Sequence, residues 1–400
     1  MRFRALPASV WALGFVSMFM DISSELVHSL LPVFMATVLG ASMTTIGLIE
    51  GIAEATAAIV KVFSGAISDY LGKRKLLAVL GYGLAAFTKP IFPLATTIGW
   101  VFTARFVDRI GKGIRVAPRD ALVADVTPKE LRGAAYGLRQ SLDSIGAFVG
   151  PLLAVVLMIA LANDIRAVLW VAVIPAFLAV ALLVFGVREP DRDSSFDSVR
   201  DTSGSSESRP APRAPIVLAD AKRLSRAYWA VVGVGFVFGM ARFSEAFLVL
   251  RAEDIGLTLS YVPVVMIVMN VVYALVAYPA GVVSDHFRPR LVLIGGLVAL
   301  VIADAILAAA TSPSWVFIGA AFWGLHMGVT QGLFSKLVAD TAPVDLRGTA
   351  FGVYNLITGV SLLLASAVAG VLWNYYGAAA TFAVGAVFAS LTMLALLRRQ

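Results

Sequence analysis

Three ionisable side chains interrupt the first apolar stretch of this 400-residue chain: Asp21, Glu25 and His28. Their spacing of about one helical turn places them on one face of a helix. Two carboxylates one turn apart do not both ionise readily where the dielectric constant is low, so one of them is expected to hold a proton. Such a group can load a proton and release it when its exposure to water changes. The chemistry indicated is proton binding and release.

A second charged stripe follows on another apolar segment: Arg105, Asp108, Arg109 and Lys112. At a rise of about 1.5 Å per residue, Asp21 and Arg109 both fall near the middle of their segments. Opposite charges at matched depth predict an ion-paired network between the two segments. We predict that the carboxylates of both stripes carry protons and that Arg105 and Arg109 modulate them. A purely structural network that locks the two helices together is the alternative.

Further polar side chains lie inside apolar segments, and we assign some of them to the same cavity: Asp143, Arg242, Glu245, His326 and Gln331. Arg242 and His326 are expected to face the first-half charges, and their cationic character suggests a substrate with an anionic or polar group. The roles of other buried charges are less clear: Glu50, Glu54, Lys61, Lys89 and Arg139. Asp304 is expected to form an interhelical pair.

The composition indicates that these ionisable side chains lie within a membrane, where each of them is energetically costly. Hydrophobic residues make up 59% of the chain and charged residues 14%, with a mean hydropathy of +0.87. Soluble domains have about 45–50% apolar and about 25% charged residues, so the chain belongs in a bilayer. An ionisable side chain at the bilayer centre costs about 2.5–3.5 kcal/mol on insertion scales. The net charge is +7, but the basic residues lie between apolar segments and form no continuous basic surface that could bind nucleic acid.

Segments of about 20 apolar residues can span a bilayer as helices. The sequence predicts an all-α membrane protein with twelve such helices, the first of them a retained helix rather than a signal peptide. Basic residues gather in alternate connections, such as Lys73–Lys75 and Arg398–Arg399, which predicts that both termini are cytoplasmic. The predicted segments are 8–37, 44–68, 76–96, 99–122, 132–160, 166–187, 226–251, 259–283, 290–310, 314–338, 347–373 and 378–397.

The chain also repeats itself. The string LVADVTPKELRGAAYG begins at Leu122, and LVADTAPVDLRGTAFG begins at Leu337. A match of this length predicts two related halves with the same orientation in the membrane. The polar stretch 188–225 is rich in Ser and Pro and is expected to be a flexible cytoplasmic linker. We therefore predict two pseudo-symmetric six-helix bundles, 1–187 and 226–400.

The connection after the second predicted helix reads GAISDYLGKRK, and its counterpart in the second half reads GVVSDHFRPR. These strings resemble the loop signature of the major facilitator superfamily, in which an Asp and basic residues follow a Gly. The resemblance implies a secondary transporter that works by alternating access. It also implies a gating cluster that latches the inner halves together: Gly65, Asp69, Gly72, Lys73, Arg74, Asp285 and Arg288.

Two further strings narrow the resemblance. RFVDRIGKG, from Arg105 to Gly113, is similar to the helix 4 motif of the superfamily, whose Arg is tied to proton coupling. GAFVGP resembles the helix 5 motif of drug–proton antiporters and contains Gly146, Gly150 and Pro151. A glycine pair one turn apart followed by Pro also favours close helix packing with a kink, and the two interpretations are compatible.

The expected function is proton-coupled efflux of a small organic molecule through the cytoplasmic membrane of a bacterium. The alternatives are uptake or facilitated transport of a polar or anionic metabolite, and transport of a metal ion. A membrane enzyme or sensor is not favoured, because the chain has no nucleophile–His–acid set, HExxH motif, P-loop or GxGxxG context. We expect a monomer with no catalytic activity, no cofactor, no bound metal and no nucleic-acid partner. Its partners are a substrate, protons and lipid.

Overall fold

The computed structural model describes residues 6–71, 73–187, 223–286, 289–330, 333–343 and 346–397, and every regular element in these ranges is helical. The first half contains α1 (Ala8–Val33), η2 (Phe34–Val38), α2 (Met43–Leu71), α3 (Arg74–Thr88), α4 (Ile91–Leu94), α5 (Ile98–Asp125), η3 (Lys129–Leu131), α6 (Arg132–Ala160), α7 (Ile165–Val171) and α8 (Val173–Gly186). The second half contains α10 (Arg226–Ala241), α11 (Ala246–Asp254), η5 (Leu259–Tyr261), α12 (Val264–His286), α13 (Pro289–Ala309), α14 (Pro313–Thr330), α15 (Leu333–Thr341), α16 (Arg347–Tyr376) and α17 (Ala378–Leu397).

Ten helical segments in the described residues are long and apolar enough to cross a membrane. Several of them join two elements, such as α10 with α11. α2 and α5 have 29 and 28 residues, so they have the length to span but are not among these ten, and α5 is much the less apolar of the two because it carries many charges. The all-helical membrane fold is as predicted from the sequence. The count of twelve spans and the cytoplasmic position of the termini stay predictions.

Two of the interrupted spans have their breaks beside charged groups. Lys89 and Pro90 separate α3 from α4, where the proline has no N–H to continue the helix. Residues 242–245 separate α10 from α11. Two backbone N–H groups at this break donate to serine hydroxyl groups. The Ser244 N–H donates to Ser366 Oγ of α16 (3.0 Å), and the Ala246 N–H donates to Ser244 Oγ (3.2 Å).

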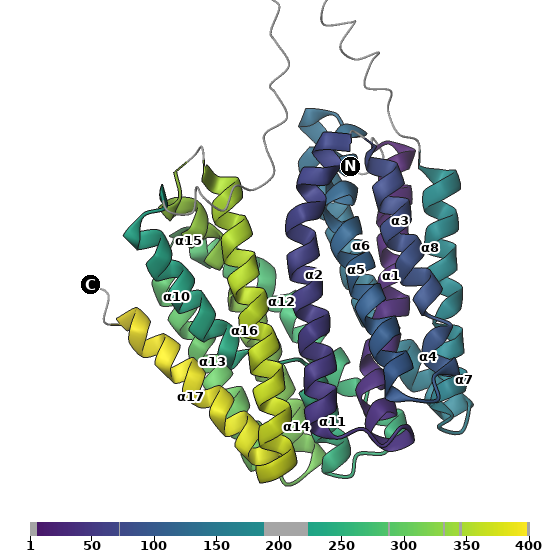
Figure 1. Cartoon of the computed structure of the whole chain (residues 1–400), viewed down its shortest axis with the longest axis vertical. Helices are drawn as coiled ribbons and strands as arrows, with labels where there is room; N and C mark the ends of the chain where they lie inside the picture. Colours follow the sequence, from purple (N-terminus) through teal and green to yellow (C-terminus); the bar gives the residue numbers. More distant parts are fainter. Residues whose placement is uncertain are drawn as a thin grey trace, which may run out of the picture.

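The helices form two groups that follow the chain order (Figure 1). In the first group α1 packs against α6 and α8, and α3 packs against α5. In the second group α13 packs against α14 and α17, and α12 packs against α14. The division at 188–225 stays a prediction, and residues 188–222 of that linker lie outside the described residues.

The two groups meet mainly where α2 packs against α16. Glycines make this contact close, because a Cβ on Gly51 would lie 2.9 Å from the Leu363 carbonyl oxygen. Gly47 lies even closer to the α16 backbone, and Gly370 is similarly close to the start of α2. Toward the other end of α2 the side chains of Phe63 and Tyr70 are exposed, and Figure 1 shows α16 leaning away from α2 there. The halves are closed at one end of the bundle and parted at the other.

Candidate functional site

A buried ion pair joins α5 to the break between α3 and α4. Lys89 Nζ lies 2.9 Å from Asp108 Oδ1, and both side chains are buried. The same ammonium group donates to Ser24 Oγ on α1 at 3.2 Å. Lys89 therefore connects three helices of the first half through one charge. The sequence showed Lys89 as a buried charge but gave no signal for its partner.

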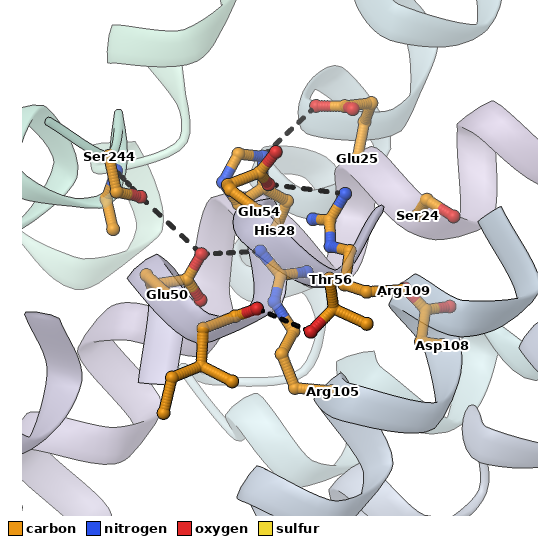
Figure 2. A network of polar contacts seen from close by, with 12 residues as sticks. Ser24, Glu25, His28, Glu50, Glu54, Thr56, Arg105, Asp108, Arg109 and Ser244 are labelled. Carbon is orange, nitrogen blue, oxygen red and sulfur yellow. Dashed lines mark hydrogen bonds and ion pairs between the residues drawn. The ribbon is translucent and has the colours of Figure 1, made fainter. Parts of the chain in front are cut away.

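Two ion pairs join α5 to α2 (Figure 2). Arg105 Nη2 lies 2.6 Å from Glu50 Oε2, and these side chains are 2% and 0% exposed. Arg109 Nη1 lies 3.4 Å from Glu54 Oε1. The Glu50 carboxylate also accepts a hydrogen bond from Ser244 Oγ at 3.5 Å, from the α10–α11 break of the second half. The first-half network thus reaches across the interface between the halves.

The prediction of ion pairs between Asp21 or Glu25 and the α5 arginines is wrong in its partners. The arginines pair with α2, and Asp108 pairs with Lys89. Glu25 Oε2 instead lies 3.6 Å from Nδ1 of His28, on its own helix. Glu50 and Glu54 were the missing partners: they also recur one turn apart, but depth matching alone could not choose between two acidic helices.

Glycines bring the charged helix α5 close to its neighbours. A Cβ on Gly111 would lie 2.6 Å from the Gly81 carbonyl oxygen of α3. A Cβ on Gly113 would lie 2.6 Å from Val60 Cβ of α2. Both glycines belong to the RIGKG string, so this string sets the distance at which α5 charges meet their partners. Lys112, between them, is exposed.

Gly146 and Gly150 of α6 pack directly against the acidic face of α1. Cβ atoms at these positions would lie 2.9 Å from Asp21 Cβ and 2.8 Å from Glu25 Cβ. Pro151 follows inside the same helix. The close packing expected of this glycine pair is therefore present, and it positions the two α1 carboxylates. The proposed kink at Pro151 stays a prediction.

A cavity of about 410 Å³ lies between α1, α6 and α12. Asp21 and Asp143 line it from the first half, and Asn270 and Tyr273 line it from the second half. Asn270 Nδ2 donates to the Ala147 carbonyl oxygen at 3.3 Å, so the halves touch beside the cavity. Of the predicted site residues, Asp21 and Asp143 line this cavity, and their role in proton coupling or substrate binding stays a prediction.

A second polar cluster adjoins this cavity through Asp143, and the sequence analysis named only Asp143 and Arg139 among its members. Arg119 donates to Ser17 Oγ at 3.0 Å and pairs with Asp120 at 3.0 Å. Arg139 Nη1 lies 2.6 Å from Asp143 Oδ2. The Arg115 guanidinium lies 4.8 Å from the centre of the Tyr82 ring. Arg115 lies three residues beyond Lys112, where the predicted stripe ends, and Arg119 lies four residues after Arg115, so extending the same periodicity would have found them.

The second half contributes fewer charges than predicted. Arg242 lies in the α10–α11 break with its guanidinium 5.7 Å from the centre of the Phe238 ring. Glu245 precedes α11, within electrostatic range of His28 and Glu54. His326 was predicted to face the first-half charges, and this is wrong: it is fully buried, with Nδ1 2.8 Å from the Gly296 carbonyl oxygen of α13. Gln331 lies outside the described residues.

Asp304 of α13 is fully buried, and neither carboxyl oxygen has a hydrogen-bond partner among the described residues. Its surroundings include Phe243 and Gly385, since a Cβ on Gly385 would lie 2.7 Å from Asp304 Oδ2. The interhelical pair expected for Asp304 is therefore absent from the described part of the chain. A buried polar group without a partner costs about 1–3 kcal/mol.

We expect opposite outcomes for two buried carboxylates. Asp108→Ala leaves the Lys89 ammonium group buried without its partner, which costs about 3–5 kcal/mol. Asp304→Ala removes an unsatisfied group, so the melting temperature should stay equal or rise. Thermal unfolding of the purified variants in one detergent measures both. A loss of stability in Asp304→Ala as large as in Asp108→Ala would show that Asp304 has a partner.

The predicted gating cluster is described in part. Arg74 Nη1 lies 2.8 Å from Asp125 Oδ2, which links the start of α3 to the end of α5. A Cβ on Gly65 would meet Ala117 Cβ at an ordinary 3.6 Å, so this glycine is not required for close packing. Lys73 is exposed. Gly72, Arg288 and the side chains of Asp69 and Asp285 lie outside the described residues.

In the described ranges, no three His, Cys, Asp or Glu side chains are grouped so that they could hold a metal ion. Glu25 and His28 form a pair, and Glu50 and Glu54 are each occupied by an arginine. The site therefore consists of ion pairs, a cavity and a helix break.

The chain is similar in sequence to a known protein family and to individual proteins. The family sequence model of the Major Facilitator Superfamily matches residues 13–250 and 230–400 of this chain. An uncharacterized MFS-type transporter of Methanocaldococcus jannaschii, MJ1317, is 29% identical over 98% of this chain and 95% of its own length. The inner membrane transport protein YajR of Escherichia coli is 23% identical over 96% of this chain and 81% of its own length.

Solved structures share the fold. A point mutant of the nucleoside transporter NupG superposes with a TM-score of 0.80 at 12% identity, covering 97% of this chain and 98% of that one. A bacterial homologue of the human lysosomal transporter Spinster, in an inward-facing and unoccupied conformation, gives a TM-score of 0.73 at 15% identity. That match covers 97% of this chain and 94% of the other.

Proposed function

Because the chain belongs to the Major Facilitator Superfamily, we propose that it is a secondary transporter that moves a small organic molecule by alternating access. We further propose that transport is coupled to protons and directed outward. The similarity of GAFVGP to the helix 5 motif of drug–proton antiporters supports this direction. Two six-helix halves would rock about the shared site.

One observation carries this proposal: charged side chains of the first half meet the second half at mid-depth. Asp21 is 13 residues from the start of α1, which is about 20 Å along the helix. The Arg105–Glu50 pair reaches Ser244 at the same interface. A charge costs several kcal/mol at this depth, so its retention supports a role in transport.

The shape of the bundle supports an inward-facing state. The halves are closed where α2 begins and parted where α2 ends. The parted end carries Lys73, Arg74 and Lys75 after α2, and basic connections stay on the cytoplasmic side. We propose that the site is closed to the outside and accessible from the cytoplasm.

Asp21→Asn is the variant that tests proton coupling. Asn has nearly the shape of Asp but cannot exchange a proton, so substrate-driven proton movement should fall to background while the fold is kept. The measurement uses proteoliposomes with an internal pH-sensitive dye and candidate organic solutes added outside. Glu253→Gln, which removes a carboxylate from the far end of α11, is the control and should behave as the unchanged chain.

Two outcomes would contradict this proposal. One is that no candidate solute moves protons with the unchanged chain, although the solute itself crosses. The other is that Asp21→Asn fails to insert or fold, which would favour the structural interpretation of the α1 charges. Size-exclusion profiles of both variants in detergent separate the second outcome from a loss of coupling.

A further inference from the structure

The cavity beside Asp21 opens between the two halves rather than within one of them. Its walls come from α1, α6 and α12. It reaches the middle of the bundle through Asp21 and ends near the surface at Ile145, Phe148 and Leu275. These three side chains are among the exposed large hydrophobic residues. Because the outer surface of the spans faces lipid, the mouth of the cavity lies against the acyl chains.

Asp21 is the charge that this cavity leaves available. No basic side chain in the described ranges forms an ion pair with it within 4.0 Å. The basic groups nearby do not line the cavity: Arg119 bonds to Ser17 and Asp120, Arg139 pairs with Asp143, and Arg115 lies over the Tyr82 ring. The Asp21 side chain is half-buried and lines the cavity, so its carboxylate can meet a ligand.

The remaining lining suits a ligand with two different ends. Near Asp21 the lining is polar and includes Gln140, Ser144 and Asn270. Two aromatic side chains, Phe148 and Tyr273, also line the cavity, and aromatic faces attract cations. The apolar surface of the cavity is much larger than its polar surface, so a ligand needs a large apolar body. An anionic ligand would meet Asp21, and no Lys, Arg or His is among the residues that line the cavity.

We infer that this cavity binds an organic cation with an apolar body, which reaches it from the bilayer through the gap between α6 and α12. The cationic centre lies against the Asp21 carboxylate, and the apolar body fills the space toward Phe148 and Leu275. This assigns a substrate class to the transporter proposed above and rests on that function. It replaces the anionic or polar substrate suggested by Arg242 and His326, since His326 is buried away from the interface.

Equilibrium binding with two probes of nearly equal shape and opposite charge tests the inference. Radiolabelled tetraphenylphosphonium should bind saturably to the purified chain in lipid nanodiscs, and tetraphenylborate should not. Asp21→Asn should weaken tetraphenylphosphonium binding by about tenfold or more, because it removes the lining carboxylate that has no ion-pair partner among the described residues. Glu253→Gln removes the same charge at the far end of α11 and should leave the affinity unchanged.

A second measurement locates the probe and keeps Asp21 intact. The chain has no cysteine, so Ser144→Cys introduces a single thiol in the cavity lining. Tetraphenylphosphonium should slow the reaction of this thiol with a maleimide. Ser42→Cys, an exposed position before α2, should react at the same rate with and without the probe.

Equal affinity of the unchanged chain and a folded Asp21→Asn variant would overturn the inference, and so would an unprotected Ser144→Cys thiol at saturating tetraphenylphosphonium. These results are separable from a failure of the proposed function. Proton movement driven by a neutral or anionic solute, without cation binding, would contradict the cation site but remain consistent with proton-coupled transport. Cation binding as described, with no solute crossing the membrane, would support the cation site and contradict the proposed transport function.

Discussion

Arg105→Ala is expected to destabilise the chain strongly. The substitution leaves the Glu50 carboxylate fully buried without its cation, and breaking a buried pair on one side costs about 3–5 kcal/mol. The Ser244 hydroxyl remains as a weak partner at 3.5 Å and cannot replace a guanidinium group. Thermal unfolding in detergent should show a melting temperature lowered by several degrees.

A double variant separates the pair from its parts. Glu50→Leu combined with Arg105→Met removes both charges and fills similar space, and such replacements of buried pairs are often neutral or stabilising. It should recover most of the melting temperature that Arg105→Ala loses, while transport remains lost. Lys61→Ala, an exposed charge on the same α2, is the control and should change little. If Arg105→Ala unfolds at the unchanged temperature, the pair does not hold α2 against α5.

Gly47→Leu is expected to abolish transport while leaving each half folded. The Gly47 backbone lies against Ser366 and Gly370 of α16, so a Leu side chain would hold α2 and α16 apart. The end of the bundle that is closed in this structure would then stay open. Solute uptake into proteoliposomes should fall to background, and a single cysteine at Thr44 should become more reactive toward a maleimide added from that side.

Gly83→Leu is the matched control for this prediction. Gly83 lies on α3, and a Cβ there would meet no atom within 4 Å. The same change of Gly to Leu should therefore leave transport and Thr44→Cys reactivity unaltered. Normal transport by Gly47→Leu would mean that close contact between α2 and α16 is not part of the cycle.

The helical membrane fold could be predicted because it depends on length and apolar composition. Runs such as 290–310 and 378–397 are nearly free of charge, and α13 and α17 lie there within one or two residues. α2 and α5 are the informative exceptions. Both carry charges along their length, yet their glycines and ion pairs pack them closely against neighbouring helices. The repeat of the LVAD string supported this organisation independently.

The pairing of charges could not be predicted, because depth alone does not determine which helices are neighbours. Arg105 lies at a suitable depth for both Glu25 and Glu50, and only the packing of α5 on α2 selects Glu50. His326 was misplaced for a similar reason. Its rotational position on α14 turns it toward Gly296 of α13, and an apolar helix with one His carries no second marker of that rotation.

Asp21 shows the opposite case. Its position at mid-depth marked it as a candidate from sequence, and the structure places it in a cavity shared by both halves. What the sequence lacked was the glycine contact: Gly146 brings α6 against Asp21, so the motif similar to that of drug–proton antiporters and the α1 carboxylate belong to one local arrangement.

The most direct test of alternating access around this site is a pair of distances measured by double electron–electron resonance. Because the chain has no cysteine, two spin-label pairs can be introduced cleanly: Ser42 with Tyr375 at the closed end, and Tyr70 with Lys336 at the parted end. Substrate or a change of pH should lengthen the first distance and shorten the second. If both distances stay fixed, or change in the same direction under every condition, the two halves do not rock about the Asp21 cavity.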